Sequence, residues 1–161
     1  MIIGLMSDSH DHVGHMRRAH AIFQERQAEL IVHAGDMISP AALRLLQNIP
    51  LAAVFGNNDG EKYGLLHLFR ERGWRLQGDY LELDVAGKRM AVYHGTVPAI
   101  RDALLACGRF QYVVSGHTHH PENRYFATTL ALNPGTTHGF GGPATVMLLD
   151  TCHDGIDLID L

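Results

Sequence analysis

Residues that can ligate a metal follow short apolar runs at several places in the sequence. They are two carboxylates, one amide and four imidazoles, contributed by Asp8, His10, Asp36, Asn57, His94, His117 and His119. A lone His-x-His pair would be weak evidence for a metal, because the chain has 12 histidines among 161 residues. Chance explains poorly why five separate runs end in the same ligand chemistry. The sequence therefore predicts a metal site assembled from several strand ends.

This ligand set is larger than one tetrahedral zinc ion needs, since such an ion takes about four ligands. It suits two ions if one carboxylate bridges them. Nitrogen and oxygen donors without thiolate fit Mn²⁺, Fe, Zn²⁺, Ni²⁺ or Co²⁺ better than Ca²⁺ or Mg²⁺, which prefer oxygen. Two such ions about 3.5–4 Å apart can hold phosphoryl oxygens and lower the pKa of a water between them. The chemistry indicated is in-line hydrolysis of a phosphate ester.

Two pairs of these residues stand two positions apart, namely Asp8 with His10 and His117 with His119. In extended backbone, residues i and i+2 point to the same side of a strand. Each pair is therefore expected to aim two ligands at one point. Glycines at positions 35, 56, 95 and 116 would let the neighbouring backbone turn sharply.

The first half of the chain alternates apolar runs with helix-like segments. Runs at 1–6, 30–34 and 51–55 have the length and composition of buried strands. Helices are expected over 12–28, over 40–48 with Ser39 as N-cap, and over 64–71. This β-α-β-α-β order predicts a sheet with parallel strands.

The second half predicts a different arrangement. Residues 80–95 alternate around a turn at 86–88 and indicate a β-hairpin. A helix is expected over 97–107, a strand at 112–115, and antiparallel strands within 123–135 and 144–161. No linker divides the chain, so we expect a single domain over 1–161: a mixed α/β sandwich with its polar residues at strand ends.

The composition argues against several classes of protein. A formal net charge of −4 without a block of lysine and arginine makes stable binding to nucleic acid improbable. No apolar stretch reaches the roughly 18–20 residues that cross a bilayer, and the N-terminus does not resemble a signal peptide. Cys107 and Cys152 lie far apart and form no metal-binding pair, which predicts a cytoplasmic location.

Each candidate has a simpler interpretation when it is taken alone. Asp8 could cap the helix that starts near residue 12. His33 lies inside a strand and fits a hydrogen-bonded core histidine, and 57–60 could be a turn, because Asn, Asp and Gly favour positive φ. Solvated or structural roles are expected for five further histidines, which are His12, His15, His20, His67 and His153.

The order of the motifs resembles the calcineurin-like metallophosphoesterase superfamily. The motifs are D-x-H at 8–10, G-D at 35–36, G-N-x-D at 56–59, H-G at 94–95 and G-H-T-H at 116–119. The short chain, the His-Gly after a hairpin and Asn133-Pro134-Gly135 are most similar to the small prokaryotic phosphodiesterase branch. The resemblance covers almost the whole chain. It implies an α/β fold with four layers, an αββα sandwich of two mixed β-sheets flanked by helices.

The resemblance also implies how the ligands divide between the ions and which residues are catalytic. A first ion would take Asp8, His10, His119 and one oxygen of Asp36, and a second would take the other oxygen of Asp36 with Asn57, His94 and His117. A hydroxide bridging the two ions would attack phosphorus. The catalytic residues carried over from the motifs are Asn58, Asp59 and His94.

The sequence departs from the family pattern in two places. Many members have histidine where this chain has Asn58, and an amide is no general acid near neutral pH. We therefore expect a preference for substrates with good leaving groups. The segment 136–139 (TTHG) replaces the serine and arginine that relatives often carry, so His138 and also His120 are candidates to supply the missing proton or to contact substrate.

The leading hypothesis is a phosphodiesterase that uses two divalent ions, Mn²⁺ first among them, on a small phosphodiester. A phosphomonoesterase acting on a phosphoprotein or nucleotide and a non-catalytic metal-binding scaffold remain the alternatives. Substrate choice would come from loops near 60–74, 97–102 and 120–125. Small relatives often form dimers or tetramers, which the resemblance carries over as the expected oligomeric state.

Overall fold

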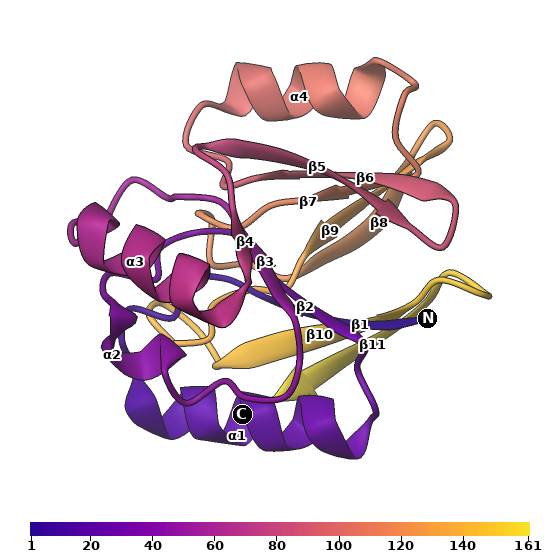
Figure 1. Ribbon diagram of the computed structural model, residues 1–161. Helices are drawn as coiled ribbons and strands as arrows, with labels where there is room; N and C mark the ends of the chain where they lie inside the picture. Colours follow the sequence, from indigo (N-terminus) through magenta and orange to yellow (C-terminus); the bar gives the residue numbers. More distant parts are fainter.

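Two β-sheets packed face to face form the centre of the molecule, with helices on both outer faces (Figure 1). The structure is a computed structural model, and it describes residues 1–161. The predicted α/β architecture of two mixed sheets flanked by helices is confirmed.

The first sheet, sheet A, has six strands. In spatial order they are β11 (Gly155–Asp160), β10 (Thr145–Asp150), β1 (Ile2–Met6), β2 (Leu30–His33), β3 (Leu51–Ala53) and β4 (Arg75–Leu76). Strands β1 to β4 are mutually parallel, whereas β10 runs antiparallel to both β1 and β11. Three helices cover the outer face of this sheet: α1 (Val13–Glu25), α2 (Pro40–Leu43) and α3 (Lys62–Arg72).

The second sheet, sheet B, has five strands. In spatial order they are β5 (Tyr80–Val85), β6 (Lys88–Tyr93), β7 (Tyr112–Val114), β9 (Thr129–Asn133) and β8 (Glu122–Phe126). Strands β6, β7 and β9 are parallel, and the two edge strands pair antiparallel with their neighbours. The helix α4 (Pro98–Ala106) covers its outer face, at the top of Figure 1.

Three apolar layers hold these elements together. A cluster of 16 buried residues fills the space between the sheets, 19 pack between sheet A and its helices, and 5 lie under α4. Alternate residues of one strand enter different layers: Tyr112 and Val114 of β7 face the other sheet, and Val113 faces α4. Strands buried on both faces explain why the central strands read as continuous apolar runs rather than as alternating ones.

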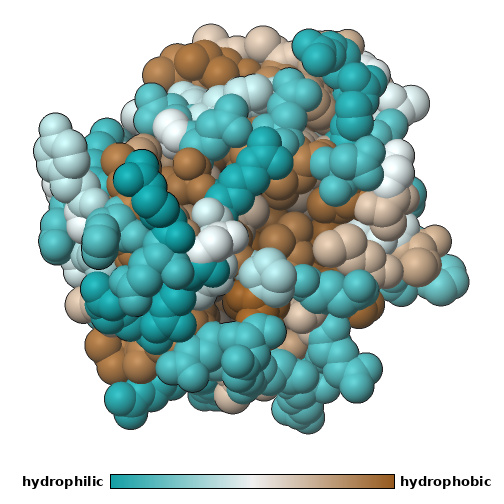
Figure 2. Space-filling model, in the orientation of Figure 1, coloured by the Kyte–Doolittle hydropathy of each residue, from teal (hydrophilic) through white to brown (hydrophobic).

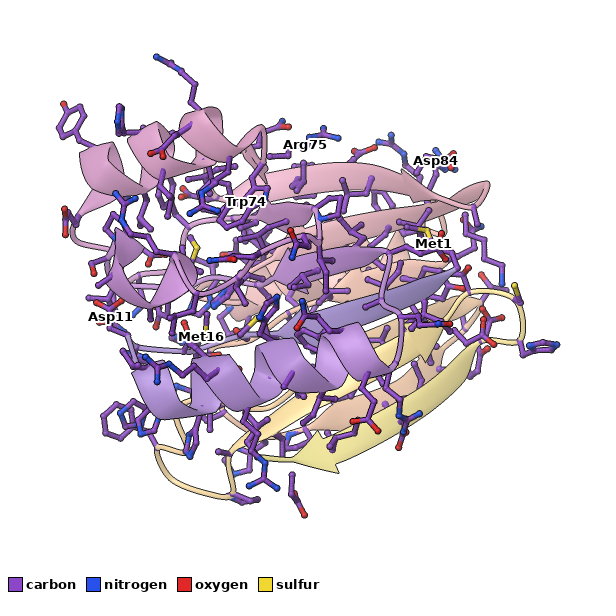
Figure 3. All side chains as sticks on the ribbon, turned by 60° about the horizontal axis from the view of Figure 1, so that its bottom comes forward. Met1, Asp11, Met16, Trp74, Arg75 and Asp84 are labelled. Atoms are coloured by element: carbon purple, nitrogen blue, oxygen red, sulfur yellow. The ribbon has the colours of Figure 1, made fainter.

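The carboxyl ends of the parallel strands of both sheets meet at one edge of the sandwich. The N-terminus is at the right of Figure 1, so β1 and its parallel neighbours end on the left. Figure 3 labels Asp11 near the amino end of α1 and Met1 at the opposite side of the sheet. Open α/β sheets bind ligands at such an edge, because loops from several strands converge there.

The structure differs from the sequence prediction in short elements. The helix expected over 40–48 is an α-helix only over Pro40–Leu43, although Ser39 caps it by accepting the Ala41 N–H at 3.2 Å. Asn48 has a left-handed backbone (φ 62°) just before Pro50, and neither residue can continue a helix. Strand β4 has only two residues, too few for any periodic signal.

No helix is long and apolar enough to cross a membrane. On the face drawn in Figure 2, hydrophobic surface is interrupted by hydrophilic residues across its whole width.

Candidate metal centre

Every predicted metal ligand lies at the edge where the parallel strands end. Asp8 and His10 follow β1, Asp36 follows β2 and Asn57 follows β3. From the other sheet, His94 directly follows β6, and His117 and His119 follow β7. Sheet A therefore contributes all the oxygen ligands and one imidazole, and sheet B contributes three imidazoles.

One group of ligands consists of Asp8, His10 and His119, whose potential ligand atoms lie within 4.8 Å of one another. Nε2 of His119 is 3.2 Å from Oδ1 of Asp8. Asp8 is fully buried, while the two histidines are half-buried and close the group toward solvent.

A second group forms around His94. Its Nε2 lies 3.1 Å from Oδ1 of Asn57 and 3.5 Å from Oδ2 of Asp36. The ring of His117 packs edge-on against that of His94, with the centroids 5.2 Å apart. His94 is almost fully buried, whereas Asn57 and His117 are exposed on the outer side.

Asp36 stands between the two groups. Its Oδ2 is 3.6 Å from Nε2 of His10 in the first group and 3.5 Å from Nε2 of His94 in the second. Burial works to raise the pKa of this carboxyl, but the charge of a protonated His94 and hydrogen bonds from Asn58 outweigh it and hold the pKa well below its usual range. Asp36 therefore stays anionic, as a residue between two cations must.

Several of these atoms have no hydrogen-bond partner that would account for their burial. Oδ1 of Asp8 and Nε2 of His10 are both buried and unpaired. A buried polar atom without a partner costs free energy, and a buried carboxylate costs the most. A cation between these atoms would satisfy both of them, so the donor set fits divalent metal ions.

Backbone carbonyls fix which nitrogen of two histidines faces the centre. Nδ1 of His94 donates to the Ala34 carbonyl at 2.7 Å, and Nδ1 of His119 contacts the Phe140 carbonyl at 3.1 Å. In each ring the lone pair of the neutral form is then on Nε2, which points at the carboxylates. Metal-ligating histidines are usually oriented by such a bond on the other nitrogen. Burial tends to lower the pKa of His94, but Asp36 and Asp8 raise it overall.

The backbone of the ligand loops is not extended. The expectation that two-residue spacing aims both members of a pair at one point holds for Asp8 and His10, which share the first group, but is wrong for His117 and His119. Five ligands have left-handed φ angles: Asp8 (52°), His10 (42°), Asp36 (59°), His117 (67°) and His119 (60°). Non-glycine residues adopt this region rarely, because the Cβ atom crowds the carbonyl oxygen. The spacing therefore separates His117 and His119 between the two groups instead of aiming them at one point. Strain of this kind gathers at functional sites.

Asn58 and Asp59 both make hydrogen bonds that connect the loops after β2 and β3. The Asn58 backbone N–H donates to Oδ1 of Asp36 and its side-chain amide donates to Oδ2, both at 2.8 Å. The buried carboxylate of Asp59 accepts backbone N–H groups of Asp36, Ile38 and Gly56 at 2.7–3.1 Å. Burial raises the pKa of Asp59 against these hydrogen bonds. Asp59 thus ties the loop after β2 to the loop after β3.

The interpretation of Asp8 as a helix cap is wrong. His12 caps α1 by accepting the His15 N–H at 3.1 Å. The carboxylate of Asp8 instead accepts the Ser7 hydroxyl at 2.6 Å and the His117 N–H at 3.1 Å.

The two candidate proton donors lie on opposite sides of the centre. His120 is exposed and lines the same hollow as His117. His138 stacks on Phe140 with centroids 3.7 Å apart and meets the His10 ring edge-on at 5.9 Å. Phe140 itself lies edge-on against His10 at 5.4 Å. No sequence signal pointed to Phe140, whose ring borders the first group and whose carbonyl orients His119.

The motifs and geometry define a phosphoester hydrolase fold, and comparison with known proteins supports this. A family model described as the calcineurin-like phosphoesterase superfamily domain matches residues 1–154. The chain belongs to this superfamily, and the predicted metal-dependent phosphoric ester hydrolase is confirmed at that level.

Among individual proteins, the chain is 30% identical over 155 residues to phosphodiesterase MJ0936 of Methanocaldococcus jannaschii, covering 94% of this chain and 93% of that protein. A solved structure described as a novel archaeal phosphodiesterase superposes with a TM-score of 0.95 at 29% identity over all of both chains. Yfce, a phosphoesterase from E. coli, shares the fold with a TM-score of 0.73 at 21% identity over 99% of both chains. These similarities support the small prokaryotic branch.

The backbone of Gly56 packs closely on Asp36, so a substitution of Gly56 tests the geometry of this loop. A Cβ at this position would lie 2.5 Å from the Asp36 amide nitrogen and closer still to its Oδ1. Gly56→Ala should therefore displace Asp36 and weaken divalent-ion binding about 10–100-fold, as loss of a supporting contact does at metal sites. Titration of metal-stripped protein with Mn²⁺ would measure this. Gly60→Ala, with nothing within 4 Å of the added Cβ, is the matched control and should bind as the wild type does.

His33, behind the centre, makes a pH-dependent contribution to stability. Its Nδ1 accepts the Gly35 N–H at 3.2 Å, so Nε2 carries the proton and donates to Ser9 Oγ at 2.9 Å. Burial and then the nearby His94 lower the pKa of His33 to about 3, from an ordinary value near 6.5. The unfolded chain takes up this proton first, so stability is lost as the pH falls below about 6.5.

We expect the metal-free wild type to lose about 1 kcal/mol of stability through this group between pH 6.5 and 5.5. His33→Gln removes the titrating group, so its stability should fall less steeply over the same range, from a lower starting value. Urea unfolding at each pH, with EDTA present, gives both slopes. Equal slopes would show that His33 is protonated in the folded protein.

Proposed function

We propose that this chain is a single-domain phosphodiesterase over residues 1–161 that hydrolyses small phosphodiesters with two divalent ions. The first ion would be held by Asp8, His10 and His119, and the second by Asn57, His94 and His117. Asp36 would serve both. The observation that carries this proposal is the pair of buried, unpaired atoms, Oδ1 of Asp8 and Nε2 of His10, beside a carboxylate that lies between two ligand groups.

When bound, two divalent ions would supply positive charge for the phosphoryl oxygens and an activated water. The residues of the chain set the conditions for that chemistry. Asp8 and Asp36 give two negative charges and the remaining ligands are neutral, so the loaded site keeps net positive charge for an anionic phosphate. Ala34 and Phe140 hold the imidazoles of His94 and His119 in place through their carbonyls. Mn²⁺ suits this oxygen and nitrogen set, with Ni²⁺, Zn²⁺, Fe and Co²⁺ as alternatives.

Asn58 supports a diester over a monoester as substrate. Its side-chain amide donates to Oδ2 of Asp36 and its backbone N–H donates to Oδ1, and an amide cannot protonate a leaving group. A role in orienting Asp36 fits these contacts better than the direct catalytic role expected from the sequence. By the same reasoning Asp59 would position the loops, and His94 would act as a ligand. The related archaeal proteins are named as phosphodiesterases, which agrees with this choice.

The scaffold alternative is less well supported, because a scaffold has no need to keep a complete ligand set and this chain keeps all seven predicted ligands at one edge. The exposed, free Cys107 and Cys152 fit a reducing compartment such as the cytoplasm. A dimer or tetramer and the absence of stable nucleic-acid binding remain part of the proposal.

Metal-stripped protein reconstituted with Mn²⁺, Ni²⁺, Zn²⁺ or Mg²⁺ tests the activity. We expect metal-dependent cleavage of bis-p-nitrophenyl phosphate, faster than cleavage of p-nitrophenyl phosphate. Asp36→Ala and His94→Ala should each lower kcat by at least about 100-fold and reduce the bound metal per chain. His67→Ala, an exposed histidine of α3, is the matched control and should keep full activity.

Faster cleavage of the monoester would overturn the interpretation of Asn58. Stoichiometric metal binding without turnover of either substrate would favour the scaffold.

The lack of a proton donor at Asn58 leads to a second kinetic prediction. Across aryl ethyl phosphodiesters of rising phenol pKa, kcat/KM should fall steeply, because the leaving phenolate departs without general acid help. A rate that does not change with phenol pKa, while chemistry limits turnover, would show that another residue protonates the leaving group.

A further inference from the structure

Two hollows of similar size, each about 470 Å³, open beside the second ligand group. One, the aromatic pocket, is lined by Phe55, Tyr80, Tyr93, Val97 and Ile100, with Asn57 at its edge. The other, the polar pocket, is lined by polar side chains and prolines, among them Arg101, His120 and Asn133, with His117 at its edge. Each pocket therefore includes one proposed ligand of the same metal ion.

The beginning of α4 separates the two pockets. Val97 and Ile100 face the aromatic pocket, whereas Pro98 and Arg101 face the polar one. Residues three apart lie on the same face of a helix, so each wall is built from one side of its first turns. Only residues 95–97 separate His94 from the start of α4. The wall between the two pockets therefore lies next to the candidate metal centre.

The aromatic pocket has flat apolar walls on one part of its lining, and Lys62, Asp79 and Thr96 complete it. The Tyr93 hydroxyl accepts the Val97 N–H at 2.9 Å, and the Tyr80 hydroxyl donates to Glu82 at 2.6 Å. Val97 and Ile100 are each 46% exposed, which leaves their side chains open to a bound group. Lys62 lies with its ammonium 4.9 Å from the Phe55 ring centroid, at the side of this pocket. An aryl ring or another flat apolar group would fit.

The polar pocket has no aromatic side chain and only the rings of Pro98 and Pro121 as apolar walls, and its cation is already neutralised. Arg101 pairs with Glu122 and donates from Nε to Ser115 Oγ at 3.2 Å. A second anionic group would therefore find no free positive charge there. Nδ1 of the exposed His120 donates to the Thr118 carbonyl at 2.5 Å, so the neutral ring offers Nε2 as an acceptor for a hydroxyl group.

We infer that the site is built for an asymmetric phosphodiester, whose flat apolar substituent occupies the aromatic pocket and whose hydroxylated alkyl substituent occupies the polar pocket. A phosphodiester carries two substituents on one phosphorus, and the two pockets flank one metal position through Asn57 and His117. The inference rests on the proposed phosphodiesterase function and names the class of its substrate.

Two substrates with the same leaving group test the polar pocket. They are p-nitrophenyl 2,3-dihydroxypropyl phosphate and p-nitrophenyl propyl phosphate, which differ only in two hydroxyls. With the metal-loaded enzyme, we expect kcat/KM to be about 3–10-fold higher for the dihydroxypropyl ester, as one or two new neutral hydrogen bonds would give. His120→Ala should reduce this ratio to below about 2.

Variants of α4 test the aromatic pocket with the same substrates. Ile100→Asn should raise KM for both esters by about 3–10-fold through lost apolar contact with the nitrophenyl group, with kcat changed less than about 2-fold and the ratio between the esters kept. Ala99→Asn lies on the same helix, is exposed and lines neither pocket, so it should leave KM unchanged.

A wild-type ratio near one, or equal KM values for Ile100→Asn and Ala99→Asn, would overturn the inference. If bis-p-nitrophenyl phosphate is still cleaved with metal dependence in that case, the proposed phosphodiesterase function stands without it. If no diester is cleaved, both fail together.

Discussion

Two buried carboxylates at the junction of two sheets set the constraint on which the rest of the site depends. Asp8 and Asp36 are almost completely withdrawn from water, and neither has a lysine or arginine partner. Burying a charge without compensation costs several kcal/mol, so the surroundings must supply positive charge or donors. Backbone N–H groups, the Ser7 hydroxyl and the imidazoles of His10, His94 and His119 converge on these two side chains. What remains unpaired matches the coordination needs of divalent cations.

The fold makes this convergence possible because the parallel strands of both sheets have their carboxyl ends at the same edge of the sandwich. Strands β1, β2 and β3 of one sheet and β6 and β7 of the other all end there. Each sheet alone would present a row of ligands on one side only. Packing the sheets through the apolar layer between them brings oxygen-rich and imidazole-rich loops into contact, and the same contact holds the sheets in register.

The fold class, and the strand ends that carry the candidate ligands, could be predicted from the sequence because both depend on local patterns. Apolar runs that end in Asp, Asn or His identify strand ends, and the order of motifs identifies the sandwich. Other features depend on contacts between distant residues. The tie between Asn58 and Asp36 joins loops 22 residues apart, and the Phe140 carbonyl that orients His119 comes from a segment without a motif. The left-handed backbone at His117 and His119 could not be predicted either, since only a small share of non-glycine residues adopt it.

Because of that left-handed backbone, the side chains of the candidate ligands reduce the conformational stability of the loops that carry them. At each of Asp8, His10, Asp36, His117 and His119, the residue that best suits the backbone is glycine, which cannot bind a metal. Replacement by glycine would remove a ligand and about 1 kcal/mol of local strain together. In a descendant no longer required to bind metal, stability itself would favour the loss of these side chains.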